Sequence, residues 1–326
     1  MTRLLQQCGR GPAEGLIELA GGANNRVYRV LLSDGAALLK WYFSDPHDPH
    51  DRLQCEWAFA DFAWAHGLRQ LPQPLACDQQ RRLGLFEFVD GRLLTVDELT
   101  RDRIHAAVDF CRELNRFRDS EPAQQLGAAA EACFSIEAHL TRIDQRVSRL
   151  RSMVQKAAVP PPARELCIQR LLPQWRDVEA RIRAEAARSG IDLRTELPAA
   201  SRVLSPSDFG FHNALLDTSG ALRFFDFEYA GWDDPAKTIC DFFCQIAVPV
   251  PPRFRDEFAR SLLADLAEPT MLERRAELLM PAYRVKWCCI VLNPLLVSGQ
   301  RRRAFSHATE APEVWMDKAR RILDQG

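Results

Sequence analysis

The hydrophobic pattern of the chain changes its period near residue 90, and this change limits the folds that the sequence can adopt. Before that point, short apolar runs of strand length alternate with turn clusters such as Ser33-Asp34-Gly35, and only residues 52–66 have helical spacing. After it, long segments repeat their apolar residues with the period of amphipathic helices. The sequence therefore predicts an α+β protein with an N-terminal lobe over residues 1–90 and a larger, mostly helical C-terminal lobe over residues 91–326.

The predicted N-terminal lobe is a small antiparallel sheet with one helix, because tight turns join antiparallel strands. Strands are expected at residues 16–20, 27–32, 36–43, 74–77 and 83–89. In the C-terminal lobe, helices are expected at residues 97–118, 131–157, 163–189, 236–247, 253–268, 271–298 and 311–324. A short β-like island over residues 203–227 interrupts these helices.

The composition excludes several classes of protein. Apolar residues make up 47% and charged residues 27% of the chain, as in ordinary globular proteins. The net charge of −1 lacks the basic excess of a nucleic-acid-binding surface. No apolar run reaches the roughly 18 to 20 residues that a membrane span needs, and the N-terminus has no apolar core of signal-peptide length. We therefore expect a soluble cytoplasmic protein without a nucleic-acid partner, and its oligomeric state stays open.

The island holds three residues suited to phosphoryl transfer. Asp208 and Asn213 are five positions apart, and Asp226 follows at the end of the next strand-like run. Transfer of a phosphoryl group from ATP requires a carboxylate that orients the attacking hydroxyl and accepts its proton. It also requires an amide oxygen and a second carboxylate that hold Mg²⁺. We therefore predict Asp208 as the catalytic residue and Asn213 and Asp226 as magnesium ligands.

The tripeptide Asp208-Phe209-Gly210 also spells the DFG motif of protein kinases, in which the aspartate binds metal. That assignment would require a catalytic aspartate and an asparagine shortly upstream. Residues 190–207 contain Asp192 but no asparagine. Because the assignment of Asp208 as the base uses both Asn213 and Asp226, we prefer it.

Lys40 and Glu56 occupy the positions expected of a phosphate-binding lysine and of the glutamate that holds it. Only five of the 43 basic residues are lysines, so a lysine within the apolar run over residues 36–43 stands out. Glu56 lies on the helix that follows this run. In a kinase fold, the corresponding strand carries the lysine and the corresponding helix carries the glutamate. We therefore assign both residues to nucleotide binding.

Two further segments are expected to contact the nucleotide. The turn cluster over residues 21–25 would cradle phosphates with its backbone amides and its asparagine side chains. Residues 87–89 end a strand at the predicted lobe boundary, where backbone groups would meet the adenine. No GxxxxGKS or GxxxxGKT sequence is present, so a P-loop kinase is not expected. The additional candidate residues are Gly21, Gly22, Asn24, Asn25, Glu87, Phe88 and Val89.

From about residue 15 to about residue 300, the chain resembles the superfamily of aminoglycoside phosphotransferases and choline/ethanolamine kinases. The superfamily motif His-Gly-Asp-x-x-x-x-Asn corresponds to Pro206-Ser207-Asp208 and then Asn213, and Ile-Asp-Trp/Phe-Glu corresponds to Phe225-Asp226-Phe227-Glu228. The resemblance implies a bilobal protein-kinase-like fold, ATP and Mg²⁺, and a small hydroxylated acceptor. The chain departs from the motif in Pro206, which replaces the histidine, and in a nucleotide loop with only two glycines.

The resemblance also points to acceptor-binding residues. Glu228, Trp232 and Asp233 follow the predicted magnesium aspartate and are expected to face the acceptor. Trp287 is similar in kind to the aromatic residues with which choline kinases hold a quaternary amine, since a cation is attracted to the face of a tryptophan ring. The acidic groups would equally accept hydrogen bonds from sugar hydroxyls. An amino alcohol and a sugar-like alcohol therefore both stay open as acceptors.

Two other functions stay open from the sequence. One is a catalytically weak or inactive pseudokinase that binds nucleotide or acts as a scaffold, which Pro206 and the glycine-poor loop suggest. The other is a protein kinase, against which stands the absence of an APE-like segment after Asp226. The sequence does not choose between ATP and GTP.

Overall fold

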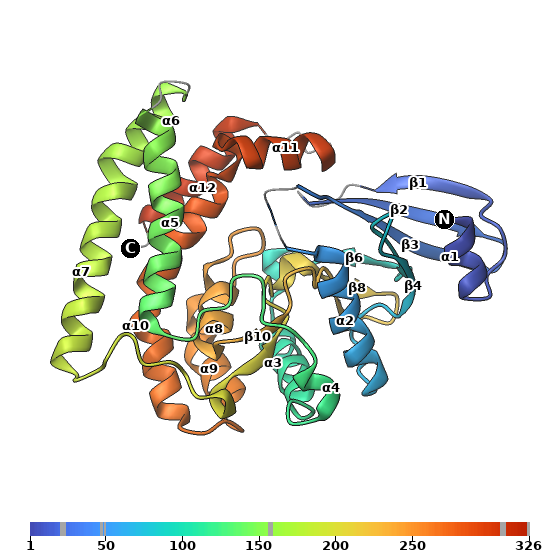
Figure 1. The fold of residues 1–326 in the computed structure, drawn as a ribbon, viewed down its shortest axis with the longest axis horizontal. Helices are drawn as coiled ribbons and strands as arrows, with labels where there is room; N and C mark the ends of the chain where they lie inside the picture. Colours follow the sequence, from blue (N-terminus) through green and yellow to red (C-terminus); the bar gives the residue numbers. More distant parts are fainter. Residues whose placement is uncertain (20–23, 46–47, 49, 156–158, 307–310, 325–326) are drawn as a thin grey trace. The chain divides into compact units, whose positions relative to one another are not determined.

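The computed structural model describes residues 1–326 except 20–23, 46–47, 49, 156–158, 307–310 and 325–326. It has a five-stranded antiparallel sheet and a mostly helical remainder (Figure 1), which confirms the predicted α+β fold class. The chain divides into two compact units, each built from three stretches of sequence. The first unit contains residues 1–130, 204–232 and 302–308, and the second contains residues 131–203, 233–301 and 309–326. The lobe boundary expected near residue 90 stays a prediction.

The large sheet belongs to the first unit. Its strands are β1 (Gly15–Leu19), β2 (Asn25–Leu32), β3 (Gly35–Tyr42), β4 (Pro74–Asp78) and β5 (Leu83–Glu87). They lie in the order β1-β2-β3-β5-β4, and every neighbouring pair is antiparallel. A two-residue turn at Ser33-Asp34 joins β2 to β3 and pairs Leu32 with Gly35. Gly35 has a φ of 136°, which favours glycine at this point of the hairpin.

The two faces of this sheet have different surroundings. On one face, α1 (Thr2–Gln7) packs Leu4 and Leu5 into an apolar core that includes Leu39. Successive side chains of a strand point to opposite faces, so Lys40 and Tyr42 lie on the face opposite Leu39. This second face carries the polar groups of the candidate site.

The other elements of the first unit connect the sheet to the predicted catalytic segments. The helix α2 (Arg52–Ala65) begins after Asp51, whose side chain accepts a hydrogen bond from Gln54 N at 2.9 Å, and it confirms the helix predicted there. The turn between β8 (Ala214–Asp217) and β9 (Leu222–Phe224) is closed by Asp217, whose Oδ1 accepts hydrogen bonds from the backbone N–H groups of Ser219 and Ala221. The further elements are α3 (Arg101–Asn115), α4 (Glu121–Gln124), η1 (Val96–Glu98), η4 (Phe211–Asn213) and a small sheet in the order β6-β8-β9, formed by β6 (Gly91–Leu93), β8 (Ala214–Asp217) and β9 (Leu222–Phe224).

The second unit is mostly helical. Its helices are α5 (Ile136–Gln155), α6 (Pro161–Leu166), α7 (Leu172–Arg188), α8 (Pro235–Cys244), α9 (Arg255–Leu263), α10 (Pro269–Val291) and α12 (Pro312–Asp324), and α11 (Val297–Ser306) begins in this unit. Helix α10 contacts α5, α7, α8, α9 and α12. The short elements are η2 (Cys167–Leu171), η3 (Ala199–Ser201), η5 (Pro252–Phe254) and η6 (Asn293–Leu295). A two-stranded sheet is formed by β7 (Val203–Ser205) and β10 (Gly231–Asp233). Within the described ranges, no helix is both long and apolar enough to span a membrane.

Two of the predicted helices are interrupted by proline. The helix predicted over residues 271–298 ends at Val291, shortly before Pro294, which has no amide hydrogen to continue it. The helix predicted over residues 163–189 contains the π-helical stretch η2 just before Pro173. The missing amide hydrogen of Pro173 removes a hydrogen bond from that turn and allows the wider winding.

Candidate active site

Lys40, Tyr42 and Glu56 form a buried polar cluster in the first unit. Lys40 and Tyr42 share one face of β3 because they are two residues apart, and α2 supplies Glu56. The Lys40 ammonium donates to the two Glu56 oxygens at 2.7 and 3.0 Å, and Tyr42 Oη donates to Glu56 Oε2 at 2.6 Å. None of the three residues is more than 4% exposed. The structure therefore brings Lys40 and Glu56 together as a buried ion pair.

Asp226 contacts the same lysine. Lys40 Nζ lies 2.8 Å from Asp226 Oδ1, and the Asp226 side chain is 22% exposed. Burial alone would lower the pKa of Lys40, but the carboxylates of Asp226 and Glu56 outweigh this effect and raise its pKa above the ordinary value. The ammonium therefore stays charged, which is the form that binds phosphate oxygens.

The predicted catalytic segments contain two residues with a left-handed backbone. Ser207 has a φ of 66° and Asp226 a φ of 70°. A non-glycine residue in this region costs on the order of 1–3 kcal/mol, and such residues gather at functional sites. Ser207 stands where the similar motif has glycine, and its backbone N–H donates to Ser205 Oγ at 3.0 Å. The chain thus keeps this turn without the residue that adopts it most easily.

Asp208 and Asn213 are linked within one compact turn. Asn213 Nδ2 donates to the backbone carbonyl of Asp208 at 2.8 Å. The backbone carbonyl of Asn213 accepts a hydrogen bond from Phe225 N at 3.0 Å, so Asn213 lies beside the segment that carries Asp226. The Asp208 side chain is 37% exposed, and its Oδ1 lies 3.2 Å from His212 Nε2.

Asp226 and Asn213 offer one carboxylate and one amide oxygen to a cation. Asn213 uses Nδ2 for the Asp208 carbonyl, which leaves Oδ1 as its ligand atom. Magnesium keeps waters and phosphate oxygens as ligands and needs only one or two protein carboxylates. No group of three His, Cys, Asp or Glu side chains suited to a metal occurs among the described residues. This donor set therefore fits a magnesium ion that arrives with a nucleotide.

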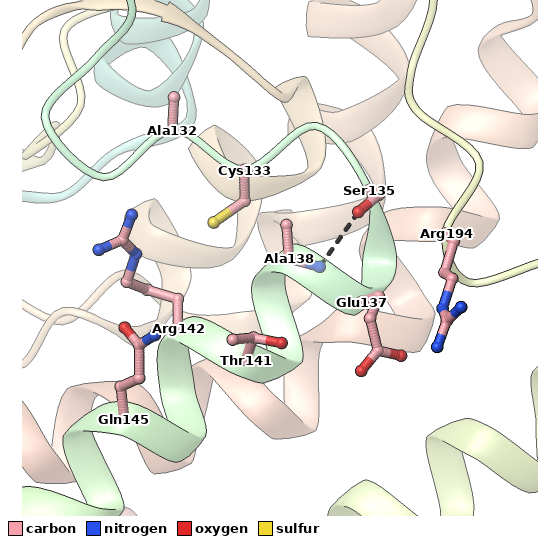
Figure 2. Close-up of a pocket in the computed structure, with 9 residues that line it drawn as sticks. All are labelled: Ala132, Cys133, Ser135, Glu137, Ala138, Thr141, Arg142, Gln145 and Arg194. Carbon is pink, nitrogen blue, oxygen red and sulfur yellow. Dashed lines mark hydrogen bonds between the residues drawn. The ribbon is translucent and has the colours of Figure 1, made fainter.

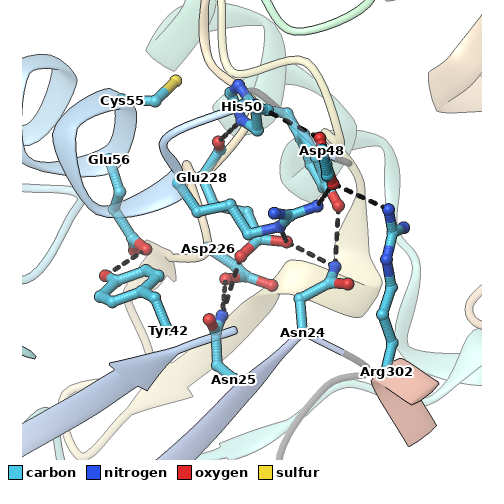
Figure 3. Close-up of polar contacts among 12 residues, drawn as sticks. Asn24, Asn25, Tyr42, Asp48, His50, Cys55, Glu56, Asp226, Glu228 and Arg302 are labelled. Atoms are coloured by element: carbon cyan, nitrogen blue, oxygen red, sulfur yellow. Dashed lines mark hydrogen bonds and ion pairs between the residues drawn. The ribbon is translucent and has the colours of Figure 1, made fainter. Parts of the chain in front are cut away.

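Glu228 lies next to Asp226 and is surrounded by polar side chains (Figure 3). Asn24 Nδ2 donates to Glu228 Oε1 at 2.6 Å, and Asn25 Nδ2 donates to Glu228 Oε2 at 3.0 Å. Asn25 Nδ2 also lies 3.4 Å from Asp226 Oδ1. Glu228 is only 1% exposed, and this burial raises the pKa of its carboxyl above the ordinary value, with the Asp226 carboxylate adding to the rise.

The other residues that were predicted to bind the nucleotide contact different partners and do not share one cluster. The Glu87 carboxylate accepts a hydrogen bond from Arg223 Nη2 at 2.9 Å at the end of β5. The guanidinium carbon of Arg29 lies 4.4 Å from the centre of the Phe88 ring, and Val89 is the next residue along the chain. Nucleotide contact by these residues stays a prediction. Gly21 and Gly22 lie outside the described residues.

The predicted acceptor residues other than Glu228 are divided between the units. Trp232, in the first unit, donates its Nε1 to a backbone carbonyl at 2.9 Å. Asp233, in the second unit, is 0% exposed, and its Oδ2 lies 2.6 Å from Lys237 Nζ. Trp287, also in the second unit, donates its Nε1 to Asp241 Oδ1 at 2.8 Å. These polar groups are engaged within their own units, and their contact with an acceptor stays a prediction.

Sequence reasoning missed Tyr42 and His50. The strand period could have found Tyr42, since a residue two positions beyond Lys40 must share its face. His50 Nε2 lies 2.6 Å from the backbone carbonyl of Glu228, and its ring stacks on Tyr229 with centroids 5.3 Å apart. No local pattern signals this contact, because 178 positions separate His50 from Glu228.

The second unit has a hollow of about 400 Å³ beside α5 (Figure 2). None of the predicted site residues lines it. The candidate active site therefore lies in the first unit. The polar residues that line the hollow are Ser135, Glu137, Thr141, Arg142, Gln145 and Arg194.

Comparisons with known proteins identify relatives of the sequence and of the fold. The sequence matches the phosphotransferase enzyme family (APH) over residues 15–278. Among curated proteins, none matches it. A similar solved structure is a choline kinase from Cryptosporidium parvum Iowa II, at 16% identity and a TM-score of 0.58, with 96% of this chain and 90% of that chain covered.

Two further solved structures have the same fold. A Plasmodium vivax ethanolamine kinase is 13% identical with a TM-score of 0.62, covering 97% of this chain and 83% of that chain. A spectinomycin phosphotransferase in complex with ADP and spectinomycin is 12% identical with a TM-score of 0.60, covering 98% of this chain and 97% of that chain. Identities this low show the shared kinase-like fold alone. The family match covers most of the sequence, and the chain therefore belongs to the phosphotransferase enzyme family.

Proposed function

We propose that the protein is a small-molecule kinase, which transfers the γ-phosphoryl group of ATP to a hydroxyl of an amino alcohol or a sugar-like alcohol in the presence of Mg²⁺. The observation that carries the proposal is the position of Lys40 Nζ, which lies 2.7 Å from Glu56 Oε1 and 2.8 Å from Asp226 Oδ1. Kinases bind nucleotide phosphates with a strand lysine paired to a helix glutamate and hold magnesium with a nearby aspartate. Membership of the phosphotransferase enzyme family supports the same class of reaction.

Each group of the candidate active site has a distinct role in the proposed reaction. Lys40 binds phosphate oxygens, and Glu56 holds its ammonium in place. Asp208 orients the acceptor hydroxyl and takes its proton, and its exposed side chain leaves it within reach of a substrate from solvent. Asn213 Oδ1 and the Asp226 carboxylate would hold Mg²⁺, which when bound offsets the negative charge of the phosphoryl groups.

The nucleotide and the acceptor are supported less directly. The ADP bound in the similar spectinomycin phosphotransferase supports ATP as the donor. We propose that the loop over residues 21–25 and the end of β5 over residues 87–89 contact it, with the lobe boundary near residue 90. The similar solved structures are named for choline, ethanolamine and spectinomycin, which supports a small hydroxylated acceptor without selecting one.

Calorimetric titration with ATP, with and without Mg²⁺, tests the metal site in wild type and in Asp226→Asn. Wild type should bind ATP more tightly with Mg²⁺, and Asp226→Asn should lose this difference and its turnover because an amide is a poorer magnesium ligand than a carboxylate. Asp119→Asn is the matched control, since the Asp119 side chain is 91% exposed, and it should behave as wild type. An ADP-release assay over amino alcohols, amino sugars and sugars then identifies the acceptor.

Two outcomes would contradict the proposal. Tight binding of ATP without ADP release from any acceptor class would favour the pseudokinase alternative. Failure of wild type to bind either ATP or GTP would exclude a reaction that uses either nucleotide.

A further inference from the structure

Glu228 carries a set of contacts that the proposed phosphoryl transfer does not use. Its carboxylate is 1% exposed, and each of its two oxygens accepts a hydrogen bond from a different asparagine, Asn24 or Asn25. Both asparagines come from the segment that ends the predicted nucleotide loop and starts β2. An acceptor molecule would have to displace both amides to reach this carboxylate.

The backbone of Glu228 and its neighbours is fixed from the other side. His50 Nε2 lies 2.6 Å from the Glu228 carbonyl, and the Cys55 thiol donates to the Ala230 carbonyl at 2.8 Å. The Tyr229 ring stacks on His50, and Tyr229 Oη accepts a second hydrogen bond from Asn24 Nδ2 at 2.8 Å. The backbone at Glu228 is therefore held in place by α2 and the residues before it. The Glu228 side chain in turn holds the two asparagines.

The restrained asparagines stand next to the phosphate-binding groups. Asn25 pairs with Tyr42 in the β2–β3 ladder, and Val27, two residues on, pairs with Lys40. The Asn25 amide reaches Asp226 Oδ1 as well as Glu228. Glu228 thus sets the position of the end of the nucleotide loop relative to both Lys40 and Asp226.

We propose that Glu228 is a positioning residue for nucleotide binding, which fastens Asn24 and Asn25 beside Asp226 through its two carboxylate oxygens. The proposal rests on the proposed function and assigns this residue to the nucleotide rather than to the acceptor. The sequence before Asn24 has only Gly21 and Gly22, fewer glycines than a GxGxxG nucleotide loop. A side-chain anchor that fixes Asn24 and Asn25 before the nucleotide arrives lowers the entropic cost of binding it.

The first test is Glu228→Gln, with kinetics measured for both substrates. Glutamine keeps the volume but has a single acceptor oxygen, so its amide N–H₂ group faces one of the asparagine amides. Loss of one ordinary hydrogen bond corresponds to a factor of about 2 to 10. We expect the KM for ATP to rise several-fold, with the kcat and the acceptor KM unchanged. Glu14→Gln is the control, because Glu14 is exposed on the same unit and should leave all three constants unchanged.

A double-mutant cycle separates the anchor from independent phosphate contacts. Asn24→Ala and Asn25→Ala should each weaken ATP binding. Glu228→Gln removes the contact to one of the two asparagines. Combined with the substitution of that asparagine, it should weaken ATP binding much less than the two single effects multiplied together, because the same contact is already lost. Effects that multiply in both cycles would overturn the proposal, since the asparagines would then act on the nucleotide without Glu228.

Other outcomes assign Glu228 a different role. A rise in the acceptor KM with an unchanged KM for ATP would return it to acceptor binding, and a changed Mg²⁺ requirement at unchanged ATP affinity would make it a metal ligand. If Glu228→Gln does not fold, as judged by thermal melting, wild-type ATP affinity in both asparagine variants would overturn the anchor. Failure of wild type to bind ATP would instead remove the proposed function, and the anchor with it.

Discussion

Removal of the Tyr42 hydroxyl tests how far the buried ion pair of Lys40 and Glu56 depends on its third member. Tyr42 Oη donates to Glu56 Oε2 at 2.6 Å, and Tyr42 is 2% exposed. A hydrogen bond to a charged group contributes about 1.5–3 kcal/mol to stability. In Tyr42→Phe, Glu56 Oε2 keeps Lys40 Nζ at 3.0 Å, so it is not left without a donor. We therefore expect a loss near the middle of that range, about 2 kcal/mol of unfolding free energy.

Urea titration measures this loss directly. Tyr28→Phe is the matched control, because Tyr28 lies on β2 of the same sheet and its hydroxyl makes no hydrogen bond to any other described residue. Enzyme kinetics supply a second readout. A less firmly held Glu56 lets the Lys40 ammonium shift, so the KM for ATP should rise several-fold while the acceptor KM stays unchanged.

The two readouts can fail separately. Equal stability of Tyr42→Phe and Tyr28→Phe would show that the buried hydrogen bond from Tyr42 to Glu56 does not stabilise the fold. A loss of stability with an unchanged KM for ATP would leave Tyr42 a structural role and show that it does not act through Lys40.

Two further predictions concern backbone strain and titration. Ser207→Gly should melt at the same or a higher temperature than wild type, because glycine adopts a φ of 66° without strain; a lower melting temperature would contradict this. His139 lies 3.1 Å from Asp234 Oδ2, and although burial favours the neutral ring, this carboxylate raises the pKa of His139 above 6.5. The stabilisation is therefore complete below pH 6.5 and is lost as the pH rises through the folded pKa, so urea titrations at several pH values should show this loss in wild type and not in His139→Gln.

The groups that could be predicted from the sequence are those whose positions depend on local structure. Asp226 follows a strand that a four-residue turn forces back onto its partner, so its approach to Asn213 is set within about a dozen residues. Lys40 and Glu56 lie on a strand and on the helix that directly follows it. In each case the period of the element and a short connection determine which side chains can meet.

The contacts that could not be predicted join residues that are far apart in the sequence. The partners of Glu228, Asn24 and Asn25, are 204 and 203 positions away, and no local pattern tells which carboxylate faces which amide. The left-handed φ of Asp226 could not be predicted from the sequence either, since aspartate usually has a negative φ. Sequence reasoning that does not know these contacts and this backbone conformation places Glu228 in an open acceptor site.

Several costs of folding in the first unit concern groups at the sheet face that carries Lys40. Buried ion pairs such as Lys40 with Glu56 are often no more stabilising than apolar side chains of the same volume. Asp226 adds a strained backbone and Glu228 a carboxyl whose ionisation burial opposes. The opposite face of the same sheet has none of these costs, since residues such as Leu39 simply pack against α1. A sheet selected for stability alone would be apolar on both covered faces, so the polar face is best explained by a reaction that requires a charged lysine between two carboxylates.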